Sequence, residues 1–212
     1  MKTTRAIGTG VYLVIDPAMD KMELYDKLDA VLAEAAGGIA ALQIWDHFRD
    51  GDDIPELINR LCQRCHVNDI PVLINNQWSY LQHTPLDGVH FDVIPPDYGA
   101  IQAAVGRPFR CGITCTNDMA PVHWAHHHGA DYISFCSMFP SSTADSCEIV
   151  APASVRRATT IYRGPIFLAG GIRPDNLAKL KKLSYAGIAV ISGIMGSDTP
   201  REAIRQYQKH IR

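Results

Sequence analysis

The sequence predicts a single closed (β/α)8 barrel (TIM barrel), an α/β fold in which eight parallel strands are surrounded by helices. Three observations favour this fold. Short apolar runs alternate with helix-length stretches along the 212 residues, eight runs have strand length, and no Pro/Ser/Gly-rich linker divides the chain. We therefore expect one domain spanning residues 1–212. An open doubly wound sheet is the alternative fold.

The expected strands are short segments rich in β-branched and aromatic residues. They cover residues 11–15, 39–44, 72–74, 88–90, 110–113, 132–135, 166–168 and 188–191. Between the first two strands, residues 20–36 have apolar side chains at nearly helical spacing, and a Gly-Gly pair follows them. Residues 54–67 predict a second helix with Leu57, Ile58, Leu61 and Cys65 on one face. Helical stretches between the other strands complete the alternation.

Two glycine-containing turns follow the last two expected strands. Gly170 and Gly171 end the seventh strand, and Pro174 stands where a helix would begin. Glycine lets a ligand approach the backbone, and a helix N-terminus attracts anions. A second turn, at Ser192 and Gly193, follows the eighth strand. Because barrels of this class often bind phosphate after strands seven and eight, we expect a phosphate seat here. The alternative is that the glycines only form tight turns.

Composition favours a cytoplasmic protein with small-molecule ligands. The net charge is −2 with both signs interspersed, so nucleic acid and anionic membranes are not expected partners. No apolar run approaches the length of a membrane span, and no signal-peptide core follows the N-terminus. The six cysteines are scattered, as in a reduced intracellular protein. Cys62 and Cys65 form a C-x-x-C pair inside a helical pattern, which we interpret as a helix face; a metal or redox site is the alternative.

In either fold, ligands bind at the carboxyl ends of the strands, so the polar residues there are the site candidates. They are Tyr12, Asp16, Gln43, Trp45, Asp46, His47, Asn75, Asn76, His90, Asp92, Thr114, Asn117, Ser137, Ser141, Ser142, Thr143, Gly171 and Ser192. A separate group, His123, His126 and His127, has a spacing that can bind metal from one helix face. Because this helix lies outside the expected barrel, we interpret the group as solvated.

The strand ends together resemble the thiamine phosphate synthase family. The matching segments, in order, are Tyr12-Leu13-Val14, Leu42-Gln43, Ile74-Asn75, Asp87-Gly88-Val89-His90, Gly129-Ala130-Asp131-Tyr132-Ile133, Phe139-Pro140 with Thr143, Gly170-Gly171-Ile172, and Val190-Ile191-Ser192 with Ile194. The resemblance covers nearly the whole chain. It implies a (β/α)8 enzyme of thiamine biosynthesis that uses Mg²⁺ to join a hydroxymethylpyrimidine diphosphate to a thiazole phosphate and releases pyrophosphate.

The resemblance also implies roles for individual residues. The thiazole phosphate would be held by Ser141, Thr143, Gly171, Ile191 and Ser192. The pyrimidine side would be formed by Tyr12, Gln43, Trp45, Asn75, Asn76 and Thr114. The candidates for proton transfer and catalysis are His47, His90 and Asp92, and Asp92 is also the candidate Mg²⁺ ligand. Assembly into a homo-oligomer is compatible with the sequence but not fixed by it.

The half of the family's site that holds diphosphate and Mg²⁺ is altered in this chain. Trp45 and His47 replace an Arg and a Lys, and Asn76 replaces a metal-binding Asp. Pro95 stands where the second Mg²⁺ carboxylate is expected, and Ala144 replaces a Lys. Magnesium needs hard oxygen ligands and the leaving diphosphate needs cations, so we expect conventional turnover to fall by many orders of magnitude.

Two alternatives follow from these departures. The thiazole tautomerases share the fold and keep the phosphate seat without a diphosphate site, but their His after the sixth strand is matched here by Ser137. His47, His90 or the thiol of Cys136 would then have to carry the proton. The other alternative is a catalytically silent protein that binds a small phosphate. Trp45 either stacks on a flat heterocycle or fills the emptied diphosphate pocket.

Overall fold

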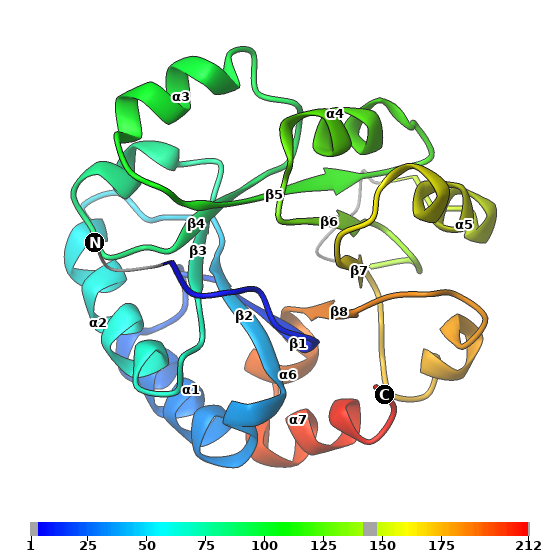
Figure 1. Cartoon of the computed structure of the whole chain (residues 1–212). Coiled ribbons are helices and arrows are strands. Elements are labelled where there is room, and N and C mark those ends of the chain that lie inside the picture. The colour runs from blue at the N-terminus through cyan, green and yellow to red at the C-terminus, as the bar shows by residue number, and fades with distance from the viewer. Residues whose placement is uncertain (1–3, 142–147, 212) are drawn as a thin grey trace.

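Residues 4–141 and 148–211 are described by the computed structural model, in which eight parallel strands close into a barrel (Figure 1). The strands are β1 (Gly10–Ile15), β2 (Ile39–Ile44), β3 (Val72–Asn75), β4 (Gly88–Phe91), β5 (Arg110–Cys115), β6 (Tyr132–Phe135), β7 (Ile166–Ala169) and β8 (Gly187–Val190). Each pairs with the next, and β1 pairs with β8. The predicted (β/α)8 barrel is confirmed. The largest difference in strand bounds is at β5, which extends two residues beyond the expected end.

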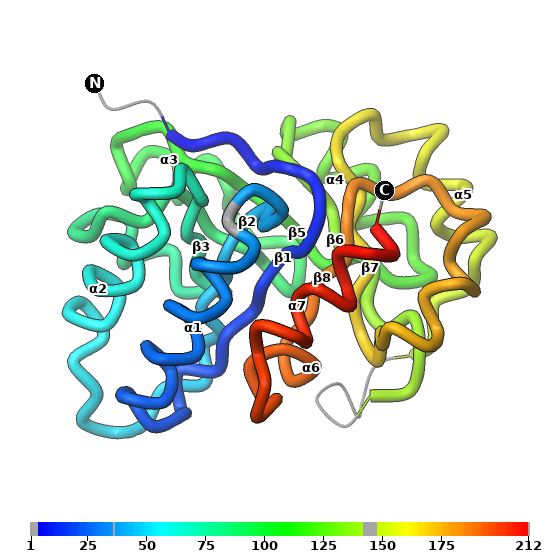
Figure 2. Tube along the Cα trace, turned by 90° about the horizontal axis from the view of Figure 1, so that it is seen from below, coloured from blue at the N-terminus to red at the C-terminus, as the bar shows by residue number. Residues whose placement is uncertain are grey.

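Helices surround the barrel on its outer side (Figure 1). They are α1 (Lys21–Ala35), α2 (Ile54–His66), α3 (Tyr98–Val105), α4 (Ala120–His128), α5 (Pro152–Ile161), α6 (Ser192–Met195) and α7 (Pro200–Gln208), with 3₁₀ turns η1 (Ala36–Gly38), η2 (Trp78–Gln82) and η3 (Leu177–Leu180). The last helix, α7, packs beside the first, α1, and so closes the outer ring (Figures 1 and 2). Within the described part of the chain, every helix is too short or too polar to span a membrane.

The segment after β7 differs from the expected structure. Pro174 does not begin an α-helix, because residues 174–176 form a turn that leads into η3. The side chain of Asn176 explains the turn: its Oδ1 accepts from the Arg173 N–H at 2.9 Å, and its Nδ2 donates to the Gly171 carbonyl at 2.9 Å. These bonds compete with a first helical turn. The expected helix N-terminus beside the phosphate seat is therefore wrong at β7.

Two apolar clusters form the core. The larger lies between the strands and the helices, and the smaller fills the inside of the barrel. The inner cluster consists of Tyr12, Val14, Ala40, Ala41, Leu73, Tyr132 and Phe167. Large and small residues complement one another there, since a Cβ at Gly112 would overlap the ring of Tyr132. Gly112 therefore makes room for a buried tyrosine in the barrel interior.

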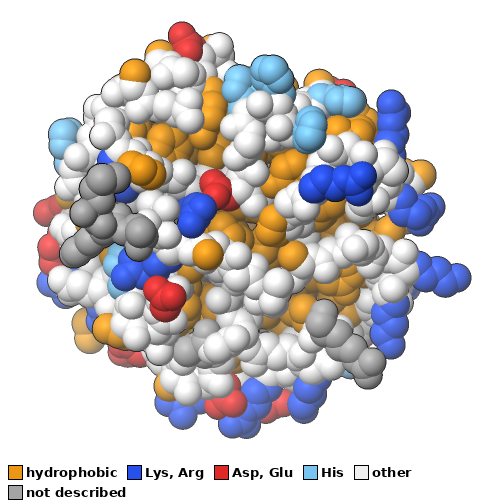
Figure 3. Space-filling model, in the orientation of Figure 1, with side chains coloured by type: hydrophobic (Ala, Val, Ile, Leu, Met, Phe, Trp, Pro, Cys, Tyr) orange, Lys and Arg blue, Asp and Glu red, His pale blue; other side chains and the backbone are white. Residues whose placement is uncertain are grey.

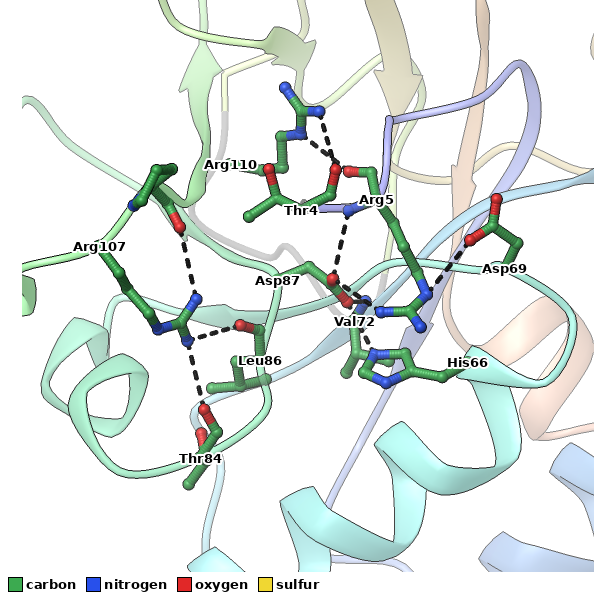
Figure 4. A network of polar contacts seen from close by, with 11 residues as sticks. Thr4, Arg5, His66, Asp69, Val72, Thr84, Leu86, Asp87, Arg107 and Arg110 are labelled. Carbon is green, nitrogen blue, oxygen red and sulfur yellow. Dashed lines mark hydrogen bonds and ion pairs between the residues drawn. The ribbon is translucent and has the colours of Figure 1, made fainter. Parts of the chain in front are cut away.

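A polar network ties the N-terminal segment to the barrel end opposite the expected site (Figure 4). The buried Asp87 carboxylate accepts from His66 Nε2 at 2.8 Å, from the Val72 N–H at 2.9 Å and from Arg5 Nη1 at 3.2 Å. Burial alone would raise the pKa of Asp87, but these hydrogen bonds outweigh burial and hold that pKa below its usual range. Arg110 Nε donates to the Arg5 carbonyl at 2.8 Å. Asp87 therefore stabilises both the barrel end and the segment that crosses it.

The histidine group on the fifth strand-to-strand connection lies on α4, at the molecular surface (Figure 3). His123, His126 and His127 are exposed. Among residues 4–141 and 148–211, no three His, Cys, Asp or Glu side chains are arranged to hold a metal ion together. The position of α4 outside the barrel agrees with the interpretation of these histidines as solvated.

Candidate functional site

Six inward-pointing polar residues at or below the carboxyl ends of β1 to β6 form a continuous hydrogen-bonded layer, here called the floor. Its members are Tyr12, Gln43, Asn75, His90, Thr114 and Tyr132. Five of them, Tyr12, Gln43, Asn75, His90 and Tyr132, are no more than 6% exposed. Buried polar groups need partners, and the floor supplies them within itself. Five of the six were predicted as site residues from the strand ends.

The first half of the floor runs from β1 to the loop after β4. Tyr12 Oη donates to Gln43 Oε1 at 2.9 Å, and Gln43 Nε2 donates to Asn75 Oδ1 at 2.5 Å. Asn75 Nδ2 then donates to Asp92 Oδ2 at 2.8 Å. Three neighbouring strands thus present amide and phenol groups in a fixed order that ends at a carboxylate.

The second half connects Tyr12 to β5 through Tyr132 and His90. The Tyr12 and Tyr132 hydroxyls lie 2.5 Å apart, and Tyr132 Oη lies 2.9 Å from His90 Nδ1. His90 Nε2 lies 2.9 Å from Thr114 Oγ1. The His90 and Tyr132 rings stack with centroids 5.5 Å apart. His90 is therefore held at both ring nitrogens and on one face.

Tyr132 is the floor residue that sequence reasoning missed as a site residue, because it begins its strand instead of ending it. The strand register places His90 opposite Gly112 and Gly112 opposite Tyr132. Gly112 has no side chain, so the Tyr132 ring can cross β5 and reach His90. A glycine inside an apolar strand was the available signal for such a close approach.

Burial controls the ionisation of the floor. It lowers the pKa of His90 to about 4, although the charge of Asp92 opposes the shift. Burial also raises the pKa values of Tyr12 and Tyr132 well above their ordinary values. At neutral pH, His90 is uncharged and both tyrosines keep their protons. The floor therefore carries no net charge, and Asp92 supplies the charge next to it.

Three residues above the floor form a second group, here called the rim: Asp46, Asn76 and Asp92. Asn76 Nδ2 donates to Asp46 Oδ2 and to Asp92 Oδ2, each at 2.8 Å. Asn76 Oδ1 accepts from the Asp92 backbone N–H at 3.0 Å, which fixes the orientation of the amide. Asn76 has a left-handed backbone with φ of 53°, a conformation that Asn tolerates better than most residues. Its NH₂ group thus bridges two carboxylates.

The rim does not fit Mg²⁺. Magnesium prefers octahedral oxygen ligands, usually with one or two carboxylates. Here the space between Asp46 and Asp92 is occupied by the hydrogens of the Asn76 amide, and the amide oxygen is turned toward a backbone N–H. The NH₂ group holds the two carboxylates together in the way that a bound cation would.

His47 and Trp45 follow β2, the strand that pairs with β1. His47 Nδ1 lies 3.3 Å from Asp16 Oδ2, and the His47 side chain is 63% exposed. The Trp45 ring is half-buried, packs against the inner apolar cluster and lies 5.2 Å from the His47 ring. His47 is therefore free to meet a ligand from solvent, while Trp45 covers part of the barrel interior.

The described residues among those predicted for the phosphate seat follow β6, β7 and β8. The loop after β6 packs on the glycine turn after β7: the Phe139 N–H donates to the Gly170 carbonyl at 3.1 Å, and a Cβ at Gly171 would overlap the Pro140 carbonyl. Gly170 and Gly171 have φ values of 85° and 62°. Ser141 directly follows Pro140 in the first of these loops.

The eighth strand completes this side of the mouth. Ile191 precedes the short helix α6, which begins at Ser192. Four of the five predicted phosphate-seat residues thus follow three adjacent strands, and Thr143 lies outside the described residues. Backbone N–H groups at the start of a helix and serine hydroxyls are suitable donors to a phosphate.

Comparison with known proteins gives a consistent result along the chain. Residues 11–194 match the family model described as thiamine monophosphate synthase. A thiamine-phosphate synthase from Methylobacillus flagellatus is 30% identical over 200 residues, covering 94% of both chains. One from Nitrosococcus oceani is 27% identical over 202 residues, covering 95% of this chain and 92% of the relative.

A solved structure agrees at the level of the fold. The thiamine phosphate pyrophosphorylase from Pyrococcus furiosus superposes with a TM-score of 0.80 over 95% of both chains, at 21% identity. The barrel, the order of the strand-end residues and the family match lead to the same assignment. The chain belongs to the thiamine monophosphate synthase family of transferases.

Proposed function

We propose that this chain is a thiamine-phosphate-synthase-like transferase that keeps the thiazole-phosphate half of its site and has largely lost the diphosphate and Mg²⁺ half. The family reaction would couple a hydroxymethylpyrimidine diphosphate to a thiazole phosphate. The observation that carries the proposal is the Asn76 amide, which bridges Asp46 and Asp92 at 2.8 Å each. A donor group in this position supports a site that needs no cation.

The proposal assigns roles to the two sides of the mouth. Ser141, Thr143, Gly171, Ile191 and Ser192 bind the phosphate of the substrate. Tyr12, Gln43, Asn75 and Thr114 form a floor for the heterocycle, next to Trp45 and Asn76. Uncharged His90 and exposed His47 are the groups that can accept or pass on a proton. Asp92 serves as a hydrogen-bond acceptor in place of a metal ligand.

The expected rate follows from the charges that the mouth lacks. One well-placed donor or cation commonly stabilises a transition state by about 3 kcal/mol, so losing two reduces turnover by roughly four orders of magnitude. Near the mouth, the described rim instead presents two carboxylates, which repel a diphosphate. Binding of the thiazole phosphate does not require these groups.

The experiment measures binding and turnover separately. Calorimetry with the thiazole phosphate is done with and without Mg²⁺ on the wild type, on Ser192→Ala and on the surface control Thr160→Ala. We expect Mg²⁺-independent binding that Ser192→Ala weakens and the control retains. Mass spectrometry with both substrates and Mg²⁺ then measures product. Absence of binding would refute the phosphate seat, and rapid Mg²⁺-dependent turnover would refute the loss of the diphosphate half.

A second candidate function is metal-free isomerisation of a thiazole phosphate, as in the tautomerases. The observation that favours it is His90, which stays uncharged at neutral pH and is held at both nitrogens below the mouth. Conversion of a thiazole carboxylate phosphate without metal, abolished in His90→Gln, would establish this activity. Binding without turnover in either assay would identify the third alternative, a silent small-phosphate binding protein.

A further inference from the structure

The floor and the rim together form one unbroken chain of hydrogen bonds from Thr114 to Asp92. Its members, in order, are Thr114, His90, Tyr132, Tyr12, Gln43, Asn75 and Asp92. Six of these seven groups can both donate and accept. Asp92, as an ionised carboxylate, can only accept. The end group therefore decides the direction of the whole chain.

The direction can be followed from Asp92 inward through two amides. Because the carboxylate only accepts, Asn75 must present its NH₂ group to Asp92, at 2.8 Å. Its Oδ1 then faces Gln43, which must present its own NH₂ group, at 2.5 Å. The Gln43 oxygen is left facing Tyr12, and an amide oxygen cannot donate. Tyr12 must therefore donate its only hydrogen to Gln43.

The same reasoning continues to the histidine. Since the Tyr12 hydrogen is used, the close contact between the two phenols requires Tyr132 to donate to Tyr12. Tyr132 then has no hydrogen for His90, so His90 must donate from Nδ1 to Tyr132 Oη. An uncharged imidazole has one N–H, which leaves Nε2 as an acceptor. Thr114 must donate its hydrogen to Nε2.

We propose that Asp92 is a positioning residue that fixes His90 in the Nδ1–H tautomer through this chain, with Tyr132 as the intermediate link. This inference concerns the site of the proposed function, but it does not depend on turnover. It has a consequence for ligand recognition. Thr114 donates its only hydroxyl hydrogen to His90, so its oxygen can only accept hydrogen bonds from the mouth. A ligand atom that meets Thr114 must therefore be a donor, such as an amino, ring N–H or hydroxyl group.

Long-range ¹H–¹⁵N correlation spectra of the full-length uniformly labelled protein at neutral pH test the inference. They distinguish the protonated from the bare ring nitrogen, and His90→Gln identifies the His90 signals. We expect Nδ1–H in the wild type. Asp92→Ala removes the acceptor, so both directions become possible and the Nε2–H form should appear. Asp92→Asn should keep His90 in the Nδ1–H form. The backbone N–H of residue 92 still bonds to Asn76 Oδ1 and so keeps the Asn76 NH₂ group turned toward the side chain of residue 92. The amide oxygen of the new side chain can then still accept at the same place.

The control is Asp16→Ala. It removes a carboxylate at the same mouth, and this carboxylate contacts His47 but no member of the hydrogen-bond chain. It should leave His90 unchanged. Tyr132→Phe should also produce the Nε2–H form, since it deletes the acceptor of Nδ1. A wild-type His90 in the Nε2–H form would overturn the inference whether or not any variant folds. A pure Nδ1–H form in Asp92→Ala would overturn the role of Asp92.

Discussion

Replacing Asn76 by Asp should create the magnesium site that the rim lacks. The substitution removes two hydrogen bonds to carboxylates, together about 2 kcal/mol at a partly exposed position, and adds a negative charge beside two others. Repulsion between charges about 4 Å apart adds roughly 1 kcal/mol or more. Asp tolerates the left-handed backbone at this position, so strain does not contribute. Without Mg²⁺, we expect a destabilisation of about 3 kcal/mol.

Magnesium should reverse most of this loss in the variant and have no effect on the wild type. At a Mg²⁺ concentration 100-fold above Kd, binding to the folded state returns about 2.7 kcal/mol. For a chain of this size that corresponds to a rise in Tm of about 5–10 °C. The assay is thermal denaturation in MgCl₂ against NaCl of equal ionic strength. The double variant N76D/D92N serves as the control and should lose the response.

A wild type that Mg²⁺ stabilises as strongly as Asn76→Asp would refute the reasoning. It would mean that the amide moves aside and that the rim binds the metal as it stands. An Asn76→Asp variant as stable as the wild type without Mg²⁺ would also contradict the reasoning, because the NH₂ bridge would then contribute nothing to the free energy of unfolding. Either result would also remove the observation that carries the proposed function.

Three further predictions concern the buried polar groups. The pKa of His90 is lowered to about 4, so as the pH falls the unfolded chain takes up a proton before the folded chain does. The free energy of unfolding should therefore fall between about pH 6.5 and 4. In urea titrations His90→Gln should reduce this dependence of the free energy on pH, and an unchanged slope would contradict burial of a neutral ring. The pKa of Asp87 is lowered, so its contribution should be lost at more acid pH, below about 4, and Asp87→Asn should lower stability at pH 7 and reduce the dependence in that range; equal stability of the variant at pH 7 would show that the network in Figure 4 is not stabilising. Tyr12→Phe leaves Gln43 Oε1 and the Tyr132 hydroxyl short of a partner and should cost about 1–3 kcal/mol in chemical denaturation, whereas a neutral effect would mean that water enters the floor.

The barrel was predictable from the sequence because its signals are local. Each buried strand is a short apolar run, and the carboxyl ends of parallel strands share one edge, so His90 and Thr114 could be assigned to one site without a structure. The helix after Gly171 was not predictable by the same rule. There the Asn176 side chain bonds to the backbone and stabilises a turn, which depends on side-chain conformation and not on apolar spacing.

Sequence reasoning could predict which residues form the site better than how these residues are arranged. Asn76 was predicted to be a lost metal ligand, but its bridge between two carboxylates depends on a left-handed backbone and on the orientation of one amide. Tyr132 reaches His90 only because Gly112 lies between them in the barrel register. Register and rotamers arise from the closed barrel, so no single segment of the sequence carries them.

Burial explains how one half of the mouth can change without loss of the fold. Tyr12 and Asn75 are each 2% exposed and bonded on two sides, so substituting either leaves an unpaired buried group and weakens the barrel itself. His47 and Asp92 are exposed, and charges in such positions contribute little to stability. Exposed positions at the mouth can therefore differ from the family's cations and metal ligands at small cost in folding, whereas the floor is held in place by the stability of the barrel. Under the proposed function, a ligand would meet a floor whose hydrogen-bond directions are fixed and a rim that presents two carboxylates, which favours a phosphorylated heterocycle with a donor group over a diphosphate.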